Sequence, residues 1–246
     1  MLVIIGWRKL TGICMKDKIT LSWVSRNRST SLAISIFSFL NRLSHHLNLE
    51  IIINLDDDDE KSIIEVLKIT EVIEKLYPNI ELKTIVTPRN GYAGIWINQN
   101  LIAKEYTGEC LLIINDDHFC DTIGWDEILR KSLSNDKPLL MWLGVDGKPH
   151  PDLLAVNKKW TDVSGGVISY RQASDIFILD ISRQCGINTI RPEISIIHLQ
   201  RKLKKIKDDG LINQNYRTES SVLSPDDYEK NVKDLVNKFK GHQNGA

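Results

Sequence analysis

The stretch LLIINDDH, from Leu111 to His118, runs four apolar residues directly into Asn-Asp-Asp. A short apolar run bounded by polar residues is typical of a buried strand. Two adjacent carboxylates are costly inside such a strand, because they repel each other and lose their hydration. We therefore expect the strand to end here, with the acids either in solvent or bound to a cation that also holds an anionic ligand.

Strand-like and helix-like segments alternate through the first half of the chain. The expected strands are 19–25, 49–55, 80–86 and 109–115, and the expected helices between them are 30–47, 60–77 and 91–106. Alternation at this pace predicts right-handed crossovers and a mainly parallel sheet.

The second half is less regular. Two helices are expected at 124–133 and 173–185, and two strands at 138–145 and 194–199, whereas 147–166 is rich in turn residues. We expect 201–220 to be exposed or mobile and 224–240 to form a last helix, which starts with Ser-Pro-Asp. The predicted fold class is α/β: a single Rossmann-like domain whose mainly parallel sheet is flanked by helices, with an elaborated C-terminal third.

Composition excludes several classes of protein. The 246 residues include 42% hydrophobic and 26% charged residues, and 32 Lys and Arg balance 32 Asp and Glu. This is an ordinary globular composition, and the zero net charge argues against a generic nucleic-acid binder, which needs excess positive charge. The four cysteines are Cys14, Cys110, Cys120 and Cys185, and they show no CxxC spacing, so we do not expect a structural zinc site. We expect them to be reduced thiols in a cytoplasmic protein.

The N-terminal residues 1–15 are expected to be an extension, poorly ordered, with the fold beginning near Met15. Their apolar run is too short to span a bilayer and lacks the layout of a signal peptide, and no other segment reaches membrane length. A cytoplasmic protein with no transmembrane segment is therefore the expectation.

Acidic residues follow two of the expected strands, at Asp56–Asp59 and at Asp116–Asp117. Parallel strands bring both groups to one edge of the sheet, where ligands bind in open α/β folds. A divalent cation that also bridges a diphosphate would relieve the repulsion among six carboxylates. The alternative for Asp58 and Asp59 is a solvated helix start, where carboxylates favour the positive end of the helix dipole.

In this order, the motifs resemble those of family 2 glycosyltransferases, which use nucleoside-diphosphate sugars and have the GT-A fold. VSRNRSTSL resembles the family's first strand and nucleotide loop, INLDDDD the acidic end of its second strand, and TPRNGYAGIWINQNL its Gly-and-Asn segment. INDDH occupies the place of the Asp-x-Asp motif, and GWDEIL follows it as in many relatives. The departure is Asn115, where the family usually has Asp.

The resemblance implies roles for particular residues. The expected sugar-nucleotide contacts are Ser25, Arg26, Asp56, Asp57, Arg89, Asn98, Asn115 and Asp116. Because Asn115 carries no charge, Asp117 is expected to hold the metal, helped by His198 of the segment ISIIHLQ. A site that includes His favours Mn²⁺ over Mg²⁺. Asp175, in ASDIFILDI, matches the base that takes the acceptor proton.

The blander alternatives stay open at this point. Asp175 can be a helix cap, His198 a structural residue, and Arg26, Arg28 and Arg89 solvated surface residues. Trp160 could stack on an acceptor from a loop, and the basic run RKLKKIK, residues 201–207, could meet a polyanion or simply be exposed.

The expected function is a metal-dependent hexosyl- or pentosyltransferase that inverts the sugar, with a UDP-sugar as the favoured donor. Residues 16–246 would form the catalytic domain, with 16–117 binding the sugar nucleotide and 118–246 facing the acceptor. Glycan, lipid-linked intermediate, protein and modified DNA remain open as acceptors. Two alternatives are a nucleotidyltransferase on a similar scaffold, although VSRNRSTS lacks the glycine of a triphosphate loop, and a non-catalytic metal-binding module, although DDDDEKS lacks the Gly and final Glu of an EF-hand.

Overall fold

The computed structural model describes residues 3–7, 17–45, 47–134, 136–146, 148–199 and 223–244. Its strands are β1 (Val3–Trp7), β2 (Ile19–Ser25), β3 (Leu49–Asp56), β4 (Glu81–Thr87), β5 (Cys110–Ile114), β6 (His118–Cys120), β7 (Leu139–Val145), β8 (Lys148–Asn157), β9 (Asn188–Ile190) and β10 (Ser195–His198). Its helices are α1 (Ser29–Leu40), α2 (Glu60–Leu76), the 3₁₀ turn η1 (Tyr92–Gly94), α3 (Ile95–Glu105), α4 (Trp125–Ser132), α5 (Lys158–Ser164), α6 (Ser174–Gln184) and α9 (Pro225–Asn244).

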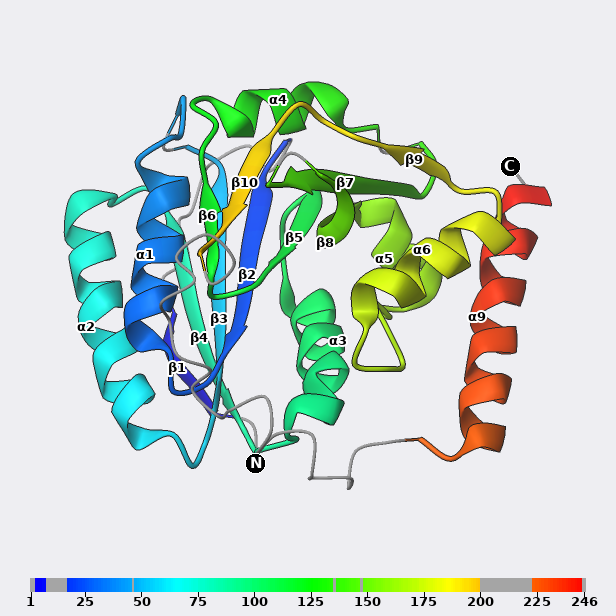
Figure 1. Ribbon diagram of the computed structural model, residues 1–246, viewed down its shortest axis with the longest axis horizontal. Helices are drawn as coiled ribbons and strands as arrows, with labels where there is room; N and C mark the ends of the chain where they lie inside the picture. Colours follow the sequence, from blue (N-terminus) through cyan, green and yellow to red (C-terminus); the bar gives the residue numbers. More distant parts are fainter. Residues whose placement is uncertain are drawn as a thin grey trace.

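The described strands form one sheet in the order β1-β4-β3-β2-β5-β8-β7-β10-β6, with β9 beside β7 (Figure 1). Strands β4, β3, β2 and β5 are parallel neighbours, as are β7 and β10. The predicted α/β class with a mainly parallel sheet is therefore confirmed. Strand β8 runs antiparallel between β5 and β7 and joins the two parallel groups.

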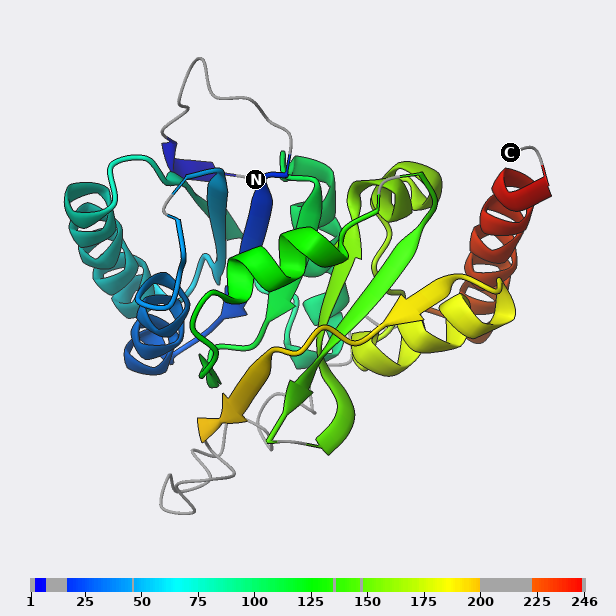
Figure 2. The ribbon, with the colours of Figure 1, turned by 90° about the horizontal axis from the view of Figure 1, so that it is seen from above.

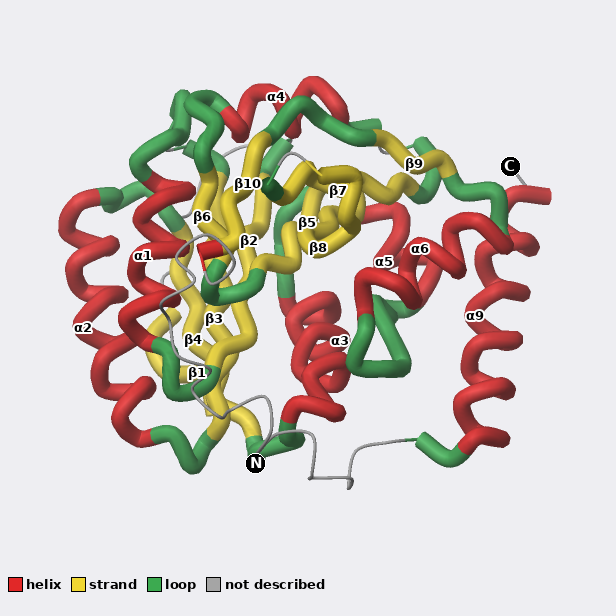
Figure 3. Tube along the Cα trace, viewed as in Figure 1, coloured by secondary structure: helices red, strands yellow, loops and turns green. Residues whose placement is uncertain are grey.

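Helices cover both faces of the sheet (Figures 2 and 3). Side chains of α1, α2 and α4 pack on one face with Ile51 and Leu112, whereas α3, α5, α6 and α9 pack on the other with Ile52 and Leu111. This split follows from the period of two in a strand, which sends successive side chains to opposite faces. It explains why the apolar runs are continuous rather than alternating.

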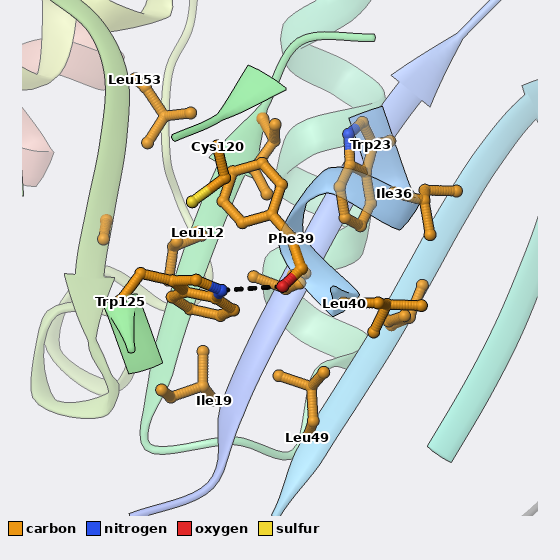
Figure 4. Close-up of a cluster of buried hydrophobic side chains, with 14 of the residues drawn as sticks. Ile19, Trp23, Ile36, Phe39, Leu40, Leu49, Leu112, Cys120, Trp125 and Leu153 are labelled. Atoms are coloured by element: carbon orange, nitrogen blue, oxygen red, sulfur yellow. Dashed lines mark hydrogen bonds between the residues drawn. The ribbon is translucent and has the colours of Figure 1, made fainter. Parts of the chain in front are cut away.

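The first of these cores is built around aromatic rings packed edge to face (Figure 4). The ring of Phe39 lies edge-on to Trp23 and Trp125, with centroids 5.9 and 5.4 Å apart, and Trp125 Nε1 donates a hydrogen bond of 2.9 Å to the Phe39 carbonyl. Edge-to-face pairs are favourable because the ring edge is positive and the face negative. The contact fixes α4 against α1.

Two expectations about the course of the chain are wrong. Residues 3–7, expected to precede the fold, form the edge strand β1, antiparallel to β4. The segment expected as turns, 147–166, contains β8 and α5. Pro149 and Pro151 argue against a central strand, but the pairing of β8 with β5 begins only at Leu154, beyond both prolines.

Trp160 does not lie on an exposed loop. It belongs to α5, is fully buried, and packs on Phe239 of α9 with ring centroids 4.7 Å apart. Its Nε1 donates to the Val167 carbonyl at 3.2 Å. The hypothesis that it stacks on an acceptor is therefore wrong.

The basic run 201–207 lies outside the described residues. Within the described ranges, no helix combines the length and the apolar character of a membrane-spanning segment.

Replacing Phe239 by Ala should destabilise the protein by about 3–5 kcal/mol, because the ring is fully buried against Trp160. Chemical denaturation measures this change. The exposed neighbour Lys240 gives the matched control, and Lys240→Ala should change the unfolding free energy by less than about 0.5 kcal/mol. Equal small effects from both variants would show that α9 is not anchored by this contact.

Candidate active site

The carboxyl ends of β2, β3, β4, β5, β7 and β10 lie at one edge of the sheet, as the strand pairing requires. The chain therefore brings together loops that are far apart in the sequence: 25–29, 56–60, 87–95, 115–118 and the end of β10. Ligands in open α/β sheets bind at this edge, so the polar side chains found here form the candidate site.

Arginines neutralise part of the acidic group after β3. Arg26 Nη1 lies 3.1 Å from Asp56 Oδ2, and its guanidinium also contacts both carboxylate oxygens of Asp58. Arg89 Nη1 reaches the same Asp58 at 3.6 Å. The hydrogen bond from Arg26 lowers the pKa of Asp58, whereas burial raises the pKa of Asp56 against the pull of Arg26. The sequence residues Arg26, Asp56 and Arg89 thus meet in one cluster.

Asp59 serves the start of α2. Its carboxylate is buried, accepts from Ser62 N at 3.2 Å as the helix cap, and accepts from Asn27 N at 2.6 Å. This is the helix-start alternative considered from the sequence, and it also ties the loop after β2 to α2. Asp57, one of the residues expected to contact the sugar nucleotide, has an exposed side chain. Its backbone N donates a hydrogen bond of 2.8 Å to Thr87 O.

Asp116 lies in the turn after β5 and is buried against the end of β2 and the loop that follows it. Ser25 Oγ donates to its Oδ2 at 2.7 Å, and Arg28 Nη1 lies 3.3 Å from its Oδ1. Burial raises the pKa of Asp116 to about 6, although Arg28 and Ser25 favour the charged form. Arg28, for which surface solvation was left open as an alternative, therefore pairs with an acid of the candidate site. The neighbouring Asn115 is exposed at the start of the turn.

Asn98 is buried and engaged within the protein. Its Oδ1 accepts from Asn90 Nδ2 at 2.9 Å and from Thr87 Oγ1 at 3.4 Å. The side chain joins α3 to the end of β4, so in this state it shapes the loop that carries Arg89. A direct contact with the sugar nucleotide stays a prediction.

The carboxylate of Asp117 lies beside two histidines. His198 Nε2 is 3.6 Å from Asp117 Oδ2, and one ligand atom each of Asp117, His118 and His198 lie within 4.8 Å of one another. All three residues are largely shielded from solvent, and His118 is fully buried. Each offers a lone pair of a kind that transition metals accept, so the set can hold a divalent ion.

The backbone explains why the histidines converge. His118 begins β6 and stands directly opposite His198 in β10, which is an antiparallel pair. Directly opposed residues point to the same face of a sheet, and the two ring centroids are 5.5 Å apart. Leu199 N donates to the Asp117 carbonyl at 2.9 Å, which continues the pairing into the turn.

His118 is the residue that the sequence analysis missed. Its signal was its position immediately after the two acids in INDDH, together with a second His on a later strand. The strand that carries it has only three residues, and its pairing with β10 joins segments almost eighty positions apart. No local pattern announces that pairing.

Asp175 lies in the first turn of α6 and is half-buried. Among the described residues, no hydrogen bond or ion pair links it to the cluster at the sheet edge. A carboxylate in this place also favours the helix dipole, so the helix-start alternative remains compatible with the geometry.

Comparison with known proteins gives the fold. A mannosyltransferase from Pyrobaculum calidifontis, solved with GDP-Man and Mn²⁺, superposes with a TM-score of 0.60 at 11% sequence identity. The alignment covers 94% of this chain and 73% of the mannosyltransferase. TarS of S. aureus, residues 1–349 with UDP-GlcNAc, gives 0.58 at 13% identity, covering 92% and 69%. This chain has a GT-A-like glycosyltransferase fold.

Sequence comparisons add no closer identification. No family model matches the chain, and no curated protein matches it. Membership of family 2 therefore stays a prediction, while the GT-A-like fold agrees with the resemblance on which that prediction depends. In this fold Arg26, Asp56 and Arg89 follow the carboxyl ends of β2, β3 and β4, which the strand pairing sets side by side.

The two neighbouring acids Asp57 and Asp59 should respond differently to replacement. Asp59→Ala removes the cap of α2 and the bond to Asn27 and should cost about 1–2 kcal/mol of stability in a urea titration. Asp57→Ala, at the exposed position, is the control and should cost less than about 0.5 kcal/mol. A harmless Asp59→Ala variant would contradict the capping role.

Proposed function

We propose that this protein is a metal-dependent glycosyltransferase, which moves a sugar from a nucleoside-diphosphate sugar to an acceptor hydroxyl with inversion. The observation that carries the proposal is the cluster of Asp117, His118 and His198 at the ligand-binding edge of a GT-A-like sheet, next to an arginine–carboxylate cluster. The candidate metal ligands, the charged side chains and the fold thus support a site at one edge of the molecule. A hexose or a pentose would suit this chemistry equally.

Asp117, His118 and His198 would hold the metal. One carboxylate and two imidazoles suit Mn²⁺, a transition-metal ion that accepts nitrogen ligands, better than Mg²⁺, which prefers oxygen ligands and keeps its water. When bound, the ion supplies positive charge where the leaving diphosphate develops negative charge. The Mn²⁺ present with the Pyrobaculum enzyme agrees with this choice.

The sugar nucleotide would bind to the half of the chain formed by residues 16–117. We assign the contacts to Ser25, Arg26, Asp56, Asp57, Arg89, Asn98, Asn115 and Asp116. The arginines are already paired with carboxylates, so this edge presents hydrogen-bond donors and hydrogen-bond acceptors in fixed positions. Such an arrangement suits a ribose and a base. A UDP-sugar is our proposed donor.

The acceptor would approach from the half formed by residues 118–246, where Asp175 is the proposed base. Taking the proton from the acceptor hydroxyl makes its oxygen a better nucleophile as the bond to the diphosphate breaks. We leave glycan, lipid-linked intermediate, protein and modified DNA as candidate acceptors. The described cysteines are free and buried, which supports the proposed cytoplasmic location.

A nucleotidyltransferase is less well supported. Such an enzyme needs cationic groups in the loop that here follows β2, to hold a triphosphate. In this loop Arg26 pairs with Asp56 and Asp58. Arg28 pairs with Asp116. The two functions differ in product. Incubation with a sugar nucleotide should release nucleoside diphosphate from a transferase, whereas a nucleotidyltransferase would release pyrophosphate from a triphosphate.

A thermal-shift screen of UDP-, GDP-, ADP- and CMP-sugars, with and without Mn²⁺, tests the function directly. One sugar nucleotide should raise the unfolding temperature by about 5 °C or more at saturating concentration, and only with Mn²⁺. Asp117→Asn, which keeps the size of the side chain, should abolish the Mn²⁺-dependent part. The same shift in wild type and Asp117→Asn would remove Asp117 from the metal site.

Asp175→Asn should leave the shift produced by the donor unchanged and lower Mn²⁺-dependent turnover of the donor at least about a hundredfold, because the amide cannot take a proton. Before the acceptor is known, hydrolysis of the donor, in which water takes the place of the acceptor hydroxyl and receives the sugar, measures turnover through the release of nucleoside diphosphate. Asp180→Asn is the matched control, since Asp180 lies on the same helix and pairs with Arg171 and Arg183. Near-normal turnover by Asp175→Asn would place the base elsewhere.

A further inference from the structure

Asp146 lies directly after β7 and adopts a backbone conformation that few residues tolerate. Its φ is +51°, in the left-handed region, where a side chain is strained unless the surroundings compensate. Asp and Asn visit this region more readily than other residues with a side chain. The position therefore calls for an explanation from its contacts.

The side chain of Asp146 continues the pairing between β7 and β10 beyond the end of β7. The regular pairing ends where Ile196 stands opposite Val145, and Asp146 N then donates to the Ile196 carbonyl at 2.8 Å. One step further, Asp146 Oδ1 accepts a hydrogen bond of 3.2 Å from His198 N. A side-chain oxygen thus takes the place that a backbone carbonyl would have in a longer strand.

His198 is consequently held from two sides. Its strand pairs with β6 on one side, where it faces His118, and with β7 and Asp146 on the other. Asp146 itself does not belong to the group of ligand atoms that lie within 4.8 Å of one another. Its contact is with the backbone that carries the imidazole, not with the metal-binding atoms.

We propose that Asp146 is a positioning residue, which fixes the end of β10 so that the imidazole of His198 faces Asp117 and His118 in the geometry that binds the metal. The proposal rests on the proposed metal site. The left-handed turn at Asp146 brings its carboxylate back toward β10, which an extended continuation of β7 would not do. Interactions that orient metal ligands typically change metal affinity by about 10- to 100-fold.

Two substitutions separate the hydrogen bond from the backbone conformation and from the charge. Asp146→Gly removes the acceptor but suits the positive φ. The lost hydrogen bond and the relieved backbone strain offset each other, so the protein without metal should unfold at a temperature close to that of wild type. Asp146→Asn keeps an acceptor oxygen and tolerates the conformation, but carries no charge. The matched control is Asp17→Gly, because Asp17 has a similar φ of +69°. Asp17 precedes the amino end of β2, whereas the candidate site lies at the carboxyl end of that strand.

Binding of Mn²⁺ to the protein without nucleotide, followed by electron paramagnetic resonance, gives the affinity. Asp146→Gly should weaken Mn²⁺ binding about tenfold or more, while Asp146→Asn and Asp17→Gly should stay within about twofold of wild type. Loss of affinity without loss of thermal stability would be the signature of a positioning role. Equal affinity in wild type and Asp146→Gly would overturn the proposal, and so would an Asp146→Asn variant as weak as Asp146→Gly, which would assign the effect to charge.

Hydrogen exchange of residues 195–199 in the absence of metal tests the hydrogen bond from His198 N to Asp146 Oδ1, here called the clamp, separately from metal binding. The His198 amide should exchange at least about tenfold faster in Asp146→Gly than in wild type and Asp146→Asn, because it loses its acceptor. Unchanged exchange would overturn the clamp whatever the metal does. If exchange responds as expected but wild type binds no Mn²⁺, the proposed metal-dependent function fails, whereas the contact between Asp146 and His198 stands.

Discussion

The pairing of β6 with β10 is the interaction on which the candidate site depends. It sets His118 opposite His198 and so turns both imidazoles to the same side, where Asp117 lies at the turn that precedes β6. A shift of one residue in this register would send one ring to the opposite face of the sheet. The two strands have three and four residues, so contacts outside the pairing are needed to hold it. The bond from Leu199 to the Asp117 carbonyl and the bond from His198 to Asp146 supply them.

Around this pairing, the acids at the edge of the sheet are divided by their partners. Asp56, Asp58 and Asp116 face arginines, Asp59 caps a helix, and Asp57 is exposed. Six carboxylates therefore do not all depend on a metal ion, contrary to what their spacing in the sequence suggests. The physical reason is that the planar fork of an arginine can hydrogen-bond to two acids at once, as Arg26 does with Asp56 and Asp58. Asp117 is the acid that the fold places with histidines instead, which separates a possible metal-ligand set from the acids that pair with arginines.

The second half of the chain extends the sheet and adds a second hydrophobic core. Strand β8 joins β5 to β7, and the helices α5, α6 and α9 form a second core on the face opposite α1 and α2. Trp160, which the sequence suggested as a stacking platform, is a central residue of that core. The likeness to solved glycosyltransferases extends over more than nine-tenths of the chain, so this later part belongs to the shared architecture as well.

The sequence by itself determined the parallel half of the sheet and the acidic loops, because apolar runs, helical periodicity and helix-start residues act over a few neighbouring positions. The resemblance of its motifs to those of family 2 glycosyltransferases singled out Asp117 and His198, which lie side by side in the structure, and Arg26, Asp56 and Arg89, which meet in one cluster. The roles of these residues stay predictions. Only the tertiary structure decided that Val3–Trp7 adds an edge strand, that 148–157 is a strand despite two prolines, and that His118 joins Asp117 and His198. Each of these depends on pairing between distant segments, whose free energy comes from a partner that no local window of sequence contains.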